Sequence, residues 1–145
     1  MNPNPDYLAL IQGVITRMAN NAFLVKGWSV TLTAALLAVG GSLSNMDNFN
    51  QPLFLVINCG CILFFLWLDS YFYYNEKKYR ELYDYACDTS RFKNEHLFNL
   101  NPNLLTPESE DSSLSLRLSV IKSSAVYPLY LMQIALSIII YLFVI

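Results

Sequence analysis

The sequence predicts an all-α membrane protein with three transmembrane helices. The second of these is expected to continue into a long cytoplasmic helix, and an amphipathic helix is expected to precede the first. Of 145 residues, 54% are hydrophobic and only 14% are charged, against about a quarter charged in an average soluble domain. The charges are also segregated, because none falls between Lys26 and Asp47, between Asp47 and Asp69, or from Ser123 to Ile145.

Three predominantly apolar stretches set the predicted spans. An α-helix needs about 20 predominantly apolar residues to cross a hydrocarbon layer of ~30 Å. The stretches of that kind are 27–44, 52–73 and 124–145. The chain is therefore treated as a single membrane domain, 1–145.

Residues 4–22 show helical periodicity. Pro5 after Asn4 suits a helix start, and apolar residues recur at spacings of three and four, at Tyr7, Leu8, Ile11, Val14, Ile15 and Met18. Two arrangements fit this pattern. One is an amphipathic helix lying in the headgroup region, and the other is a cytoplasmic helix packed against the rest of the protein.

The first span carries small residues along one side. They follow a spacing of four, three, four and three, at Gly27, Thr31, Ala34, Ala38 and Gly41. Helix association in lipid depends on close packing, so this stripe is predicted to pack against another helix.

The second and third spans each carry a polar edge. Gln51, Asn58 and Asp69 are separated by 7, 11 and 18 positions, which at 100° per residue places them within about 20° of one direction. The third span repeats polar residues at spacings of three and four, at Ser123, Tyr127, Tyr130, Gln133, Ser137 and Tyr141. These groups should avoid lipid, so they either bond one another inside a bundle or line a water-filled path between assembled copies.

Asp69 is an acid at the inner end of the second span. It lies 17 residues after Pro52, about 26 Å along a helix, and Lys26 begins the antiparallel first span at a similar depth. An ion pair between Lys26 and Asp69 is predicted, with a structural role preferred over a proton or ion relay.

The segment 74–100 keeps helical signals, because oppositely charged residues recur four apart, as in Glu76 with Arg80. It is predicted to extend the second span as a helix into the cytoplasm. Residues 101–113 have the Pro, Ser and acidic composition of a linker. The alternation of Leu114, Leu116, Leu118 and Val120 suggests either a short strand or the lead into the last helix.

The positions of the basic residues predict orientation. All nine Lys and Arg residues lie outside segment 42–51, the loop between the first two spans. By the positive-inside tendency, the N-terminus and 74–122 are cytoplasmic, whereas 42–51 and the C-terminus face outward. Trp28, Trp67, Tyr71, Tyr73 and Tyr74 suit an aromatic belt at the inner surface.

No motif for catalysis, cofactor binding or metal binding is present. His96 is the one histidine and does not make zinc-ligand spacing with Cys87. There is no phosphate-binding glycine loop and no G-x-S-x-G turn. A net charge of -2 excludes a strongly basic nucleic-acid surface. A protein without enzymatic activity, cofactor, metal or nucleic-acid partner is expected.

The order of parts resembles the SLATT-like small helical membrane proteins associated with bacterial conflict and antiphage defence operons. The resemblance covers roughly residues 5–90, and its most specific piece runs from "WLDSYF" to "EKKYRELY". The span at 124–145 is a departure from the simplest two-span plan. The resemblance implies a membrane effector that assembles and permeabilises or perturbs the bacterial inner membrane when a partner signals infection.

Two functions follow as expectations. The first is an oligomeric effector whose polar stripes become a conduction path, with segment 70–100 receiving the signal from a cytoplasmic sensor protein. The second is a membrane anchor or scaffold that recruits a soluble partner through the same segment without conducting. Both have membrane lipids as partners, and the first is a homo-oligomer.

Overall fold

The computed structural model describes residues 4–46, 49–88, 90–104, 123 and 125–143. This part of the chain is all-helical and contains no strand. The long helices are α1 (Pro5–Leu43) and α2 (Gln51–Cys87), followed by two 3-10 turns, η1 (Asn94–His96) and η2 (Pro102–Leu104), and by α4 (Tyr127–Phe143). The prediction of an all-α protein is confirmed for these residues.

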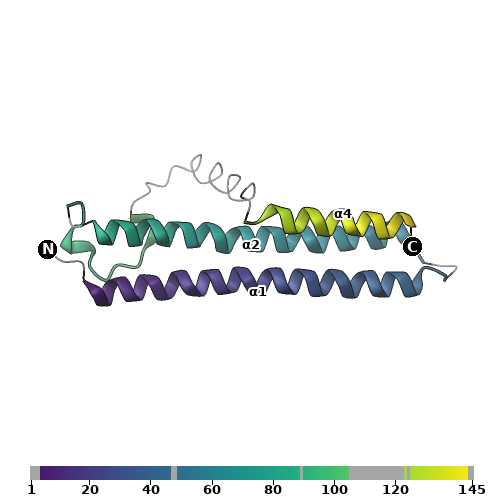
Figure 1. Cartoon of the computed structure of the whole chain (residues 1–145), viewed down its shortest axis with the longest axis horizontal. Coiled ribbons are helices and arrows are strands. Elements are labelled where there is room, and N and C mark those ends of the chain that lie inside the picture. Colours follow the sequence, from purple (N-terminus) through teal and green to yellow (C-terminus); the bar gives the residue numbers. More distant parts are fainter. Residues whose placement is uncertain (1–3, 47–48, 89, 105–122, 124, 144–145) are drawn as a thin grey trace.

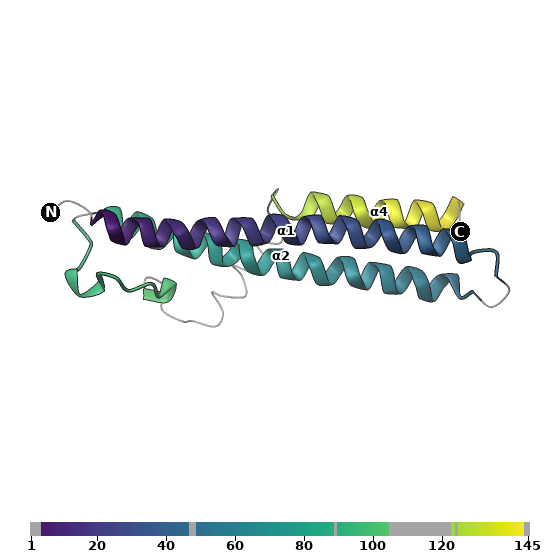
Figure 2. The ribbon, with the colours of Figure 1, turned by 90° about the horizontal axis from the view of Figure 1, so that it is seen from below.

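The three helices lie side by side in one elongated bundle. Figure 1 shows α1 and α2 running alongside each other over their full length, with α4 against only one half of the pair, and Figure 2 shows the same arrangement from below. The short connection between Leu43 and Gln51 makes α1 and α2 antiparallel neighbours. The bundle therefore has a three-helix half, which contains the α1–α2 connection, and a two-helix half, which contains the start of α1 and the end of α2.

Local hydrogen bonds define where α1 and α2 begin. The Asn4 side chain accepts hydrogen bonds from the backbone N–H groups of Asp6 and Tyr7, at 3.0 and 3.1 Å. Asn50 accepts one from the N–H of Leu53, at 3.1 Å. An asparagine cap followed by a proline in the first turn is a favoured helix start. The asparagine side chain accepts a hydrogen bond from a free backbone N–H of the first turn, and proline has no N–H that requires an acceptor.

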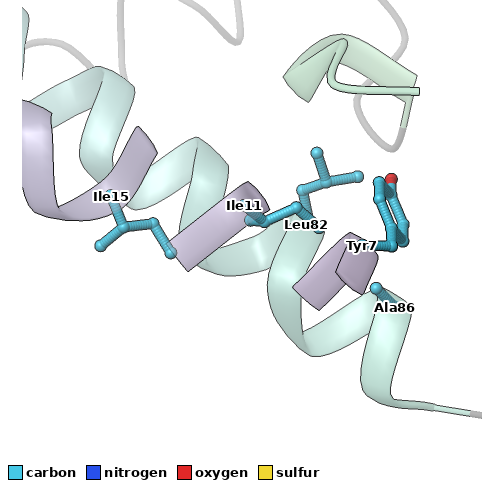
Figure 3. Close-up of a cluster of buried hydrophobic side chains, with 5 residues drawn as sticks. All are labelled: Tyr7, Ile11, Ile15, Leu82 and Ala86. Atoms are coloured by element: carbon cyan, nitrogen blue, oxygen red, sulfur yellow. The ribbon is translucent and has the colours of Figure 1, made fainter. Parts of the chain in front are cut away.

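Helix α1 joins two elements that the sequence analysis separated. Residues 4–22 and 27–44 are expected as an amphipathic helix and a first span, but residues 5–43 form one continuous helix. Tyr7, Ile11 and Ile15 are buried against Leu82 and Ala86 of α2 (Figure 3). Of the two arrangements left open for 4–22, packing against the rest of the protein is the one found.

Helix α2 ends earlier than predicted. It continues past the second span as expected, but it stops at Cys87, so the prediction of a helix through residue 100 is wrong. Asp88 takes an extended backbone conformation with ψ at 91°, and its carboxylate accepts hydrogen bonds from both the N–H and the hydroxyl of Ser90. These two hydrogen bonds hold the pKa of Asp88 below its ordinary value. A side chain that bonds the backbone two residues on competes with the helix, which accounts for the stop.

Residues 88, 90–104 fold back onto the end of the two-helix half, and we call this segment the clasp. Its contacts centre on Tyr7, whose ring lies 5.9 Å from both the Phe92 and the Phe98 ring centroids. The Tyr7 hydroxyl donates a hydrogen bond of 2.6 Å to the carbonyl oxygen of Asn99. Burial raises the pKa of Tyr7 above its ordinary value, with a further rise from nearby Tyr85.

Other predicted segments are described in part. Of the linker predicted at 101–113, residues 102–104 form η2, and 105–113 lie outside the described residues. The alternating segment 114–120 also lies outside them. The span expected at 124–145 corresponds to α4, which begins at Tyr127.

The three-helix half buries polar side chains beside a small apolar cluster that includes Ile62 and Val126, and most of its other large apolar side chains lie on the outside. The buried set includes Ser29, Thr33, Asn58, Asp69, Gln133 and Ser137. Large apolar residues are exposed on all three helices, for example Phe64, Trp67 and Leu136. Helices α1 and α2 are each long and apolar enough to cross a membrane, and only 22% of the most apolar stretch of each is buried. That low burial suits lipid-facing helices better than core helices of a water-soluble protein, which are mostly buried.

Candidate functional site

The buried polar side chains of the three-helix half form successive layers, and we call them the polar core. In the first layer, Lys26 Nζ lies 2.7 Å from Asp69 Oδ1. The Asp69 side chain is fully buried, whereas the Lys26 side chain is 28% exposed. The Tyr130 hydroxyl adjoins the Asp69 carboxylate, but it and Asp69 Oδ2 have no hydrogen-bond partner. This layer joins all three helices around one acid.

The second layer is about one helical turn away. The Ser29 hydroxyl donates a buried hydrogen bond of 2.8 Å to Gln133 Oε1, which joins α1 to α4. Ser29 follows Lys26 by three positions, and Gln133 follows Tyr130 by three positions, so both lie on the face that carries the first layer. The Gln133 Nε2 group is buried without a partner.

The third layer joins α2 to α4. Asn58 Nδ2 donates a hydrogen bond of 2.9 Å to the Ser137 hydroxyl oxygen, and both side chains are buried. The Ser137 hydroxyl in turn donates a hydrogen bond of 2.7 Å to the backbone carbonyl oxygen of Gln133. Asn58 Oδ1 is buried and accepts nothing. Gln51 and Tyr141 lie beyond this layer, around a small cavity that Asn58 and Ser137 also line.

The polar edges predicted on the second and third spans therefore face one another within a single chain over much of their length, although Tyr127 at the start of α4 is exposed. The structure brings Asn58, Asp69, Tyr130, Gln133 and Ser137 into the polar core. It also joins Lys26 and Asp69 in the pair that the sequence predicts. An apolar surrounding strengthens each of these polar contacts and makes each unpaired atom costly.

Two polar core residues on α1 were missed by the sequence analysis. Ser29 and Thr33 are 0% and 5% exposed and lie inside the bundle. They are polar, four positions apart, and in line with Lys26 three positions before Ser29. That spacing is the signal that could have identified them as the polar edge of the first span.

The predicted small-residue stripe does not pack against α2 or α4. Gly27, Thr31, Ala34 and Ala38 are exposed, and Gly41 is half-buried. A Cβ added at Gly27 or Gly41 would meet nothing within 4 Å. The stripe is therefore not a packing face between the described helices of one chain, and its packing against a helix of another copy stays a prediction. The physical reason is that Lys26 and Ser29 find bonding partners inside the bundle, which turns the small residues outward.

Groups suited to metal binding or nucleophilic chemistry are scarce. Within the described ranges no three His, Cys, Asp or Glu side chains come together in a way that could hold a metal ion. His96 Nδ1 is 3.1 Å from the Tyr85 hydroxyl in the clasp. Cys59 and Cys61 are half-buried free thiols on α2, and Cys87 is exposed at its end.

Comparisons of this chain with protein-family models, with curated proteins and with solved structures gave no match. The fold and the polar core define the chain as a helical protein with two helices able to cross a membrane.

Proposed function

We propose that this chain is a non-enzymatic effector of the bacterial inner membrane, which oligomerises and permeabilises or perturbs that membrane in antiphage defence. The observation that carries the proposal is the environment of Asp69. Its carboxylate is fully buried between three helices, where Oδ1 pairs with Lys26 and the Tyr130 hydroxyl adjoins the group. An ionisable group at membrane depth costs several kcal/mol unless fully paired, and such groups mark functional sites.

The proposal places α1, α2 and α4 across the membrane, with the N-terminus and the clasp in the cytoplasm and the C-terminus outside. The apolar exterior of the three-helix half supports this arrangement. Trp28 and Trp67, at 69% and 60% exposed, lie near the Lys26–Asp69 level and suit the inner headgroup region. Helix α1 has about 58 Å of length, so its first half extends beyond a hydrocarbon layer of ~30 Å.

Self-association uses the outer face of α1 in this proposal. The small-residue stripe borders an open groove of about 560 Å³, which Phe23, Trp28 and Leu32 help to line. Small residues flanked by larger ones let two helix backbones approach closely, and packing of that kind drives helix association in lipid. A second copy of the chain is the proposed occupant.

Conduction requires the polar core to open. In the single chain α4 is joined to α1 by Ser29–Gln133 and to α2 by Asn58–Ser137. Such contacts are each worth only about 0.6 kcal/mol in membrane proteins, so α4 can separate and leave its polar edge to partners in other copies. A cytoplasmic sensor protein that contacts segment 70–100 would supply the signal, through the end of α2 and the clasp.

A second candidate function is a membrane anchor or scaffold that recruits a soluble partner without conducting. One observation favours it: the polar edges already bond each other within one chain. An anchor requires only these hydrogen bonds within one chain, since its polar core serves to hold the three helices together and does not have to open.

Dye entry into expressing cells separates the two candidates. The test replaces Asn58, Gln133 and Ser137 together by leucine, and its matched control replaces the exposed residues Val30, Gly60 and Met132 by leucine. The effector proposal expects leakage in wild type and in the control, and at least a tenfold loss in the test variant. Intact membranes in wild type under strong expression would support the anchor. A monomeric mass in detergent would contradict a shared channel.

A further inference from the structure

The open groove on the outer face of α1 has a length that suits one half of a bilayer. It runs from Phe23 to Ala35, and we call it the α1 groove. Twelve positions of helix rise by about 18 Å, and half of a hydrocarbon layer of ~30 Å is about 15 Å thick. A lipid acyl chain that lies beside α1 in one leaflet therefore has a groove of matching length.

The cytoplasmic end of the α1 groove continues into polar side chains. Residues on the face of the groove recur at spacings of three, four and three, at Arg17, Asn20, Leu24 and Gly27. Residues three and four apart are neighbours on a helix surface, so Arg17 and Asn20 lie in line with the groove. Both side chains are exposed, and that of Asn21 is half-buried. One face of α1 therefore changes from polar to apolar at Phe23.

Arg17 is a cation without a partner among the described residues. None of their ion pairs or hydrogen bonds involves it. The one acid on α1 is Asp6, which is eleven positions earlier, or about 16 Å along the helix. A guanidinium group can bind a phosphate through two parallel hydrogen bonds, and an asparagine side chain offers two further donors. This end of the α1 groove therefore fits a phosphate group.

We infer that an anionic phospholipid of the inner leaflet binds along α1, with its phosphate at Arg17 and an acyl chain in the α1 groove. Anionic lipids of that leaflet attract basic residues next to a membrane span. A second copy of α1 is a poorer occupant at this end. Copies inserted in the same direction bring two Arg17 side chains together, and like charges repel each other.

The inference rests on the membrane placement in the proposed function and deepens that proposal. The proposed function gives the α1 groove to a second copy in the assembled state. A lipid that fills the groove of the single chain must leave before the second copy packs there, so anionic lipid regulates assembly by competing for one surface.

Tryptophan fluorescence of the full chain in vesicles tests the inference. Trp28 lines the α1 groove, whereas Trp67, the other tryptophan of the chain, lies on α2. The vesicles are phosphatidylcholine with an equal minor fraction of either phosphatidylglycerol or phosphatidylcholine that carries brominated acyl chains, because bromine quenches tryptophan on contact. In the variant Trp67→Phe, Trp28 should be quenched at least twofold more by the brominated phosphatidylglycerol. In the matched control Trp28→Phe, Trp67 should be quenched equally by both lipids.

Equal quenching of Trp28 by the two brominated lipids would overturn the inference. Weak quenching of Trp28 by both, with Trp67 quenched normally, would also overturn it, because a second copy would then fill the groove. In both cases the proposed function still stands. If neither tryptophan is quenched, the helices do not lie in the membrane and the proposed function fails as well.

A charge variant tests the position of the phosphate. Arg17→Gln, made together with Trp67→Phe, should remove the preference of Trp28 for the brominated phosphatidylglycerol. The matched control Arg91→Gln changes an exposed arginine of the clasp and should keep the preference. A preference that persists in Arg17→Gln would contradict the assignment of Arg17 to the phosphate.

Discussion

Lys26 and Asp69 meet across the α1–α2 interface with Nζ and Oδ1 2.7 Å apart, and their burial is unequal. The Asp69 side chain is completely enclosed, whereas more than a quarter of the Lys26 side chain reaches the surface. A lysine can extend its ammonium group toward water while its stem stays packed. Asp69 cannot reach water in that way, so losing its partner should cost Asp69 more free energy than it costs Lys26.

The first prediction follows from this asymmetry. Lys26→Met leaves a buried carboxylate without its cation and should lower the free energy of unfolding by about 3–5 kcal/mol. Asp69→Asn leaves a lysine that can reach water, and should cost only about 1.5 kcal/mol. Unfolding titrations in detergent measure both. As a matched control, Lys93→Met at the exposed Lys93–Glu95 pair should change stability by less than about 0.5 kcal/mol.

A second prediction concerns charge reversal. Lys26→Asp and Asp69→Lys each place like charges together and should reduce the folded protein recovered from membranes. The double variant restores an opposite pair and should recover at least half of the loss. Recovery below that of both single variants would show that the pairing is not what stabilises this interface.

The ion pair could be predicted because helix geometry is regular. Counting 17 residues from Pro52 gives the depth of Asp69 without any knowledge of other contacts. The polar edges of α2 and α4 were predictable for the same reason, since spacings of 7, 11 and 18 fix a direction on any helix. Each of these statements concerns one helix at a time.

The parts that the sequence analysis missed depend on contacts between segments. Which face of α1 turns inward is decided by Gln133 and Asp69, which lie on other helices. The contact between Tyr7 and Asn99 joins residues 92 positions apart, and no local pattern encodes it. The end of α2 is different, because the Asp88–Ser90 spacing is a local turn signal. The oppositely charged pairs four apart in the preceding residues favoured a longer helix, and the predicted helix therefore continued past this turn.

A third prediction concerns the Asn58–Ser137 layer. In a double-mutant cycle, Asn58→Ala and Ser137→Ala should show a coupling energy of about 0.6 kcal/mol, the average for hydrogen bonds between helices in a membrane. Asn58→Ala combined with Thr31→Ala is the control, because Thr31 is exposed and bonds its own helix at Gly27. That pair should be additive within about 0.3 kcal/mol. A coupling energy between Asn58 and Ser137 that is also below about 0.3 kcal/mol would contradict the Asn58–Ser137 hydrogen bond.

A fourth prediction concerns Tyr7 in the clasp. Tyr7→Phe removes only the hydrogen bond to Asn99 and should cost about 1 kcal/mol. Tyr7→Ala also removes the ring from between Phe92, Phe98 and Leu82, and should cost about 3–5 kcal/mol. Hydrogen exchange of the backbone amides in 90–104 reports both, with Ala expected to raise exchange far more than Phe. Equal effects of the two variants would show that the ring packing contributes nothing.

The same residue gives a pH dependence. The pKa of Tyr7 is raised in the folded chain, so the folded state keeps its proton at pH values where the unfolded state has lost it. The stability contributed by Tyr7 is fully present below about pH 10, the unfolded value, and is lost as the pH rises toward the folded value. Clasp amide exchange should increase above about pH 10 in wild type. Tyr7→Phe should lack that component of the increase.

The fifth prediction is the tautomer of His96. The Lys93 backbone N–H donates to the Tyr85 hydroxyl oxygen at 3.3 Å, which leaves the hydroxyl proton free to donate to His96 Nδ1 at 3.1 Å. The neutral imidazole must then carry its proton on Nε2, the nitrogen that lies 3.7 Å from Glu95 Oε1. Because the chain has one histidine, ¹⁵N NMR at about pH 8 resolves the tautomer directly.

Tyr85→Phe should convert the His96 spectrum to a mixture of both tautomers, since no hydroxyl then selects between the two nitrogens. Tyr83→Phe, two positions away on the same helix, is the matched control and should leave the spectrum unchanged. A wild-type spectrum dominated by the Nδ1–H form would mean that His96 donates to Tyr85. The hydroxyl would then accept hydrogen bonds from both His96 and the Lys93 N–H, and the direction of the Tyr85–His96 hydrogen bond would be the reverse of the predicted one.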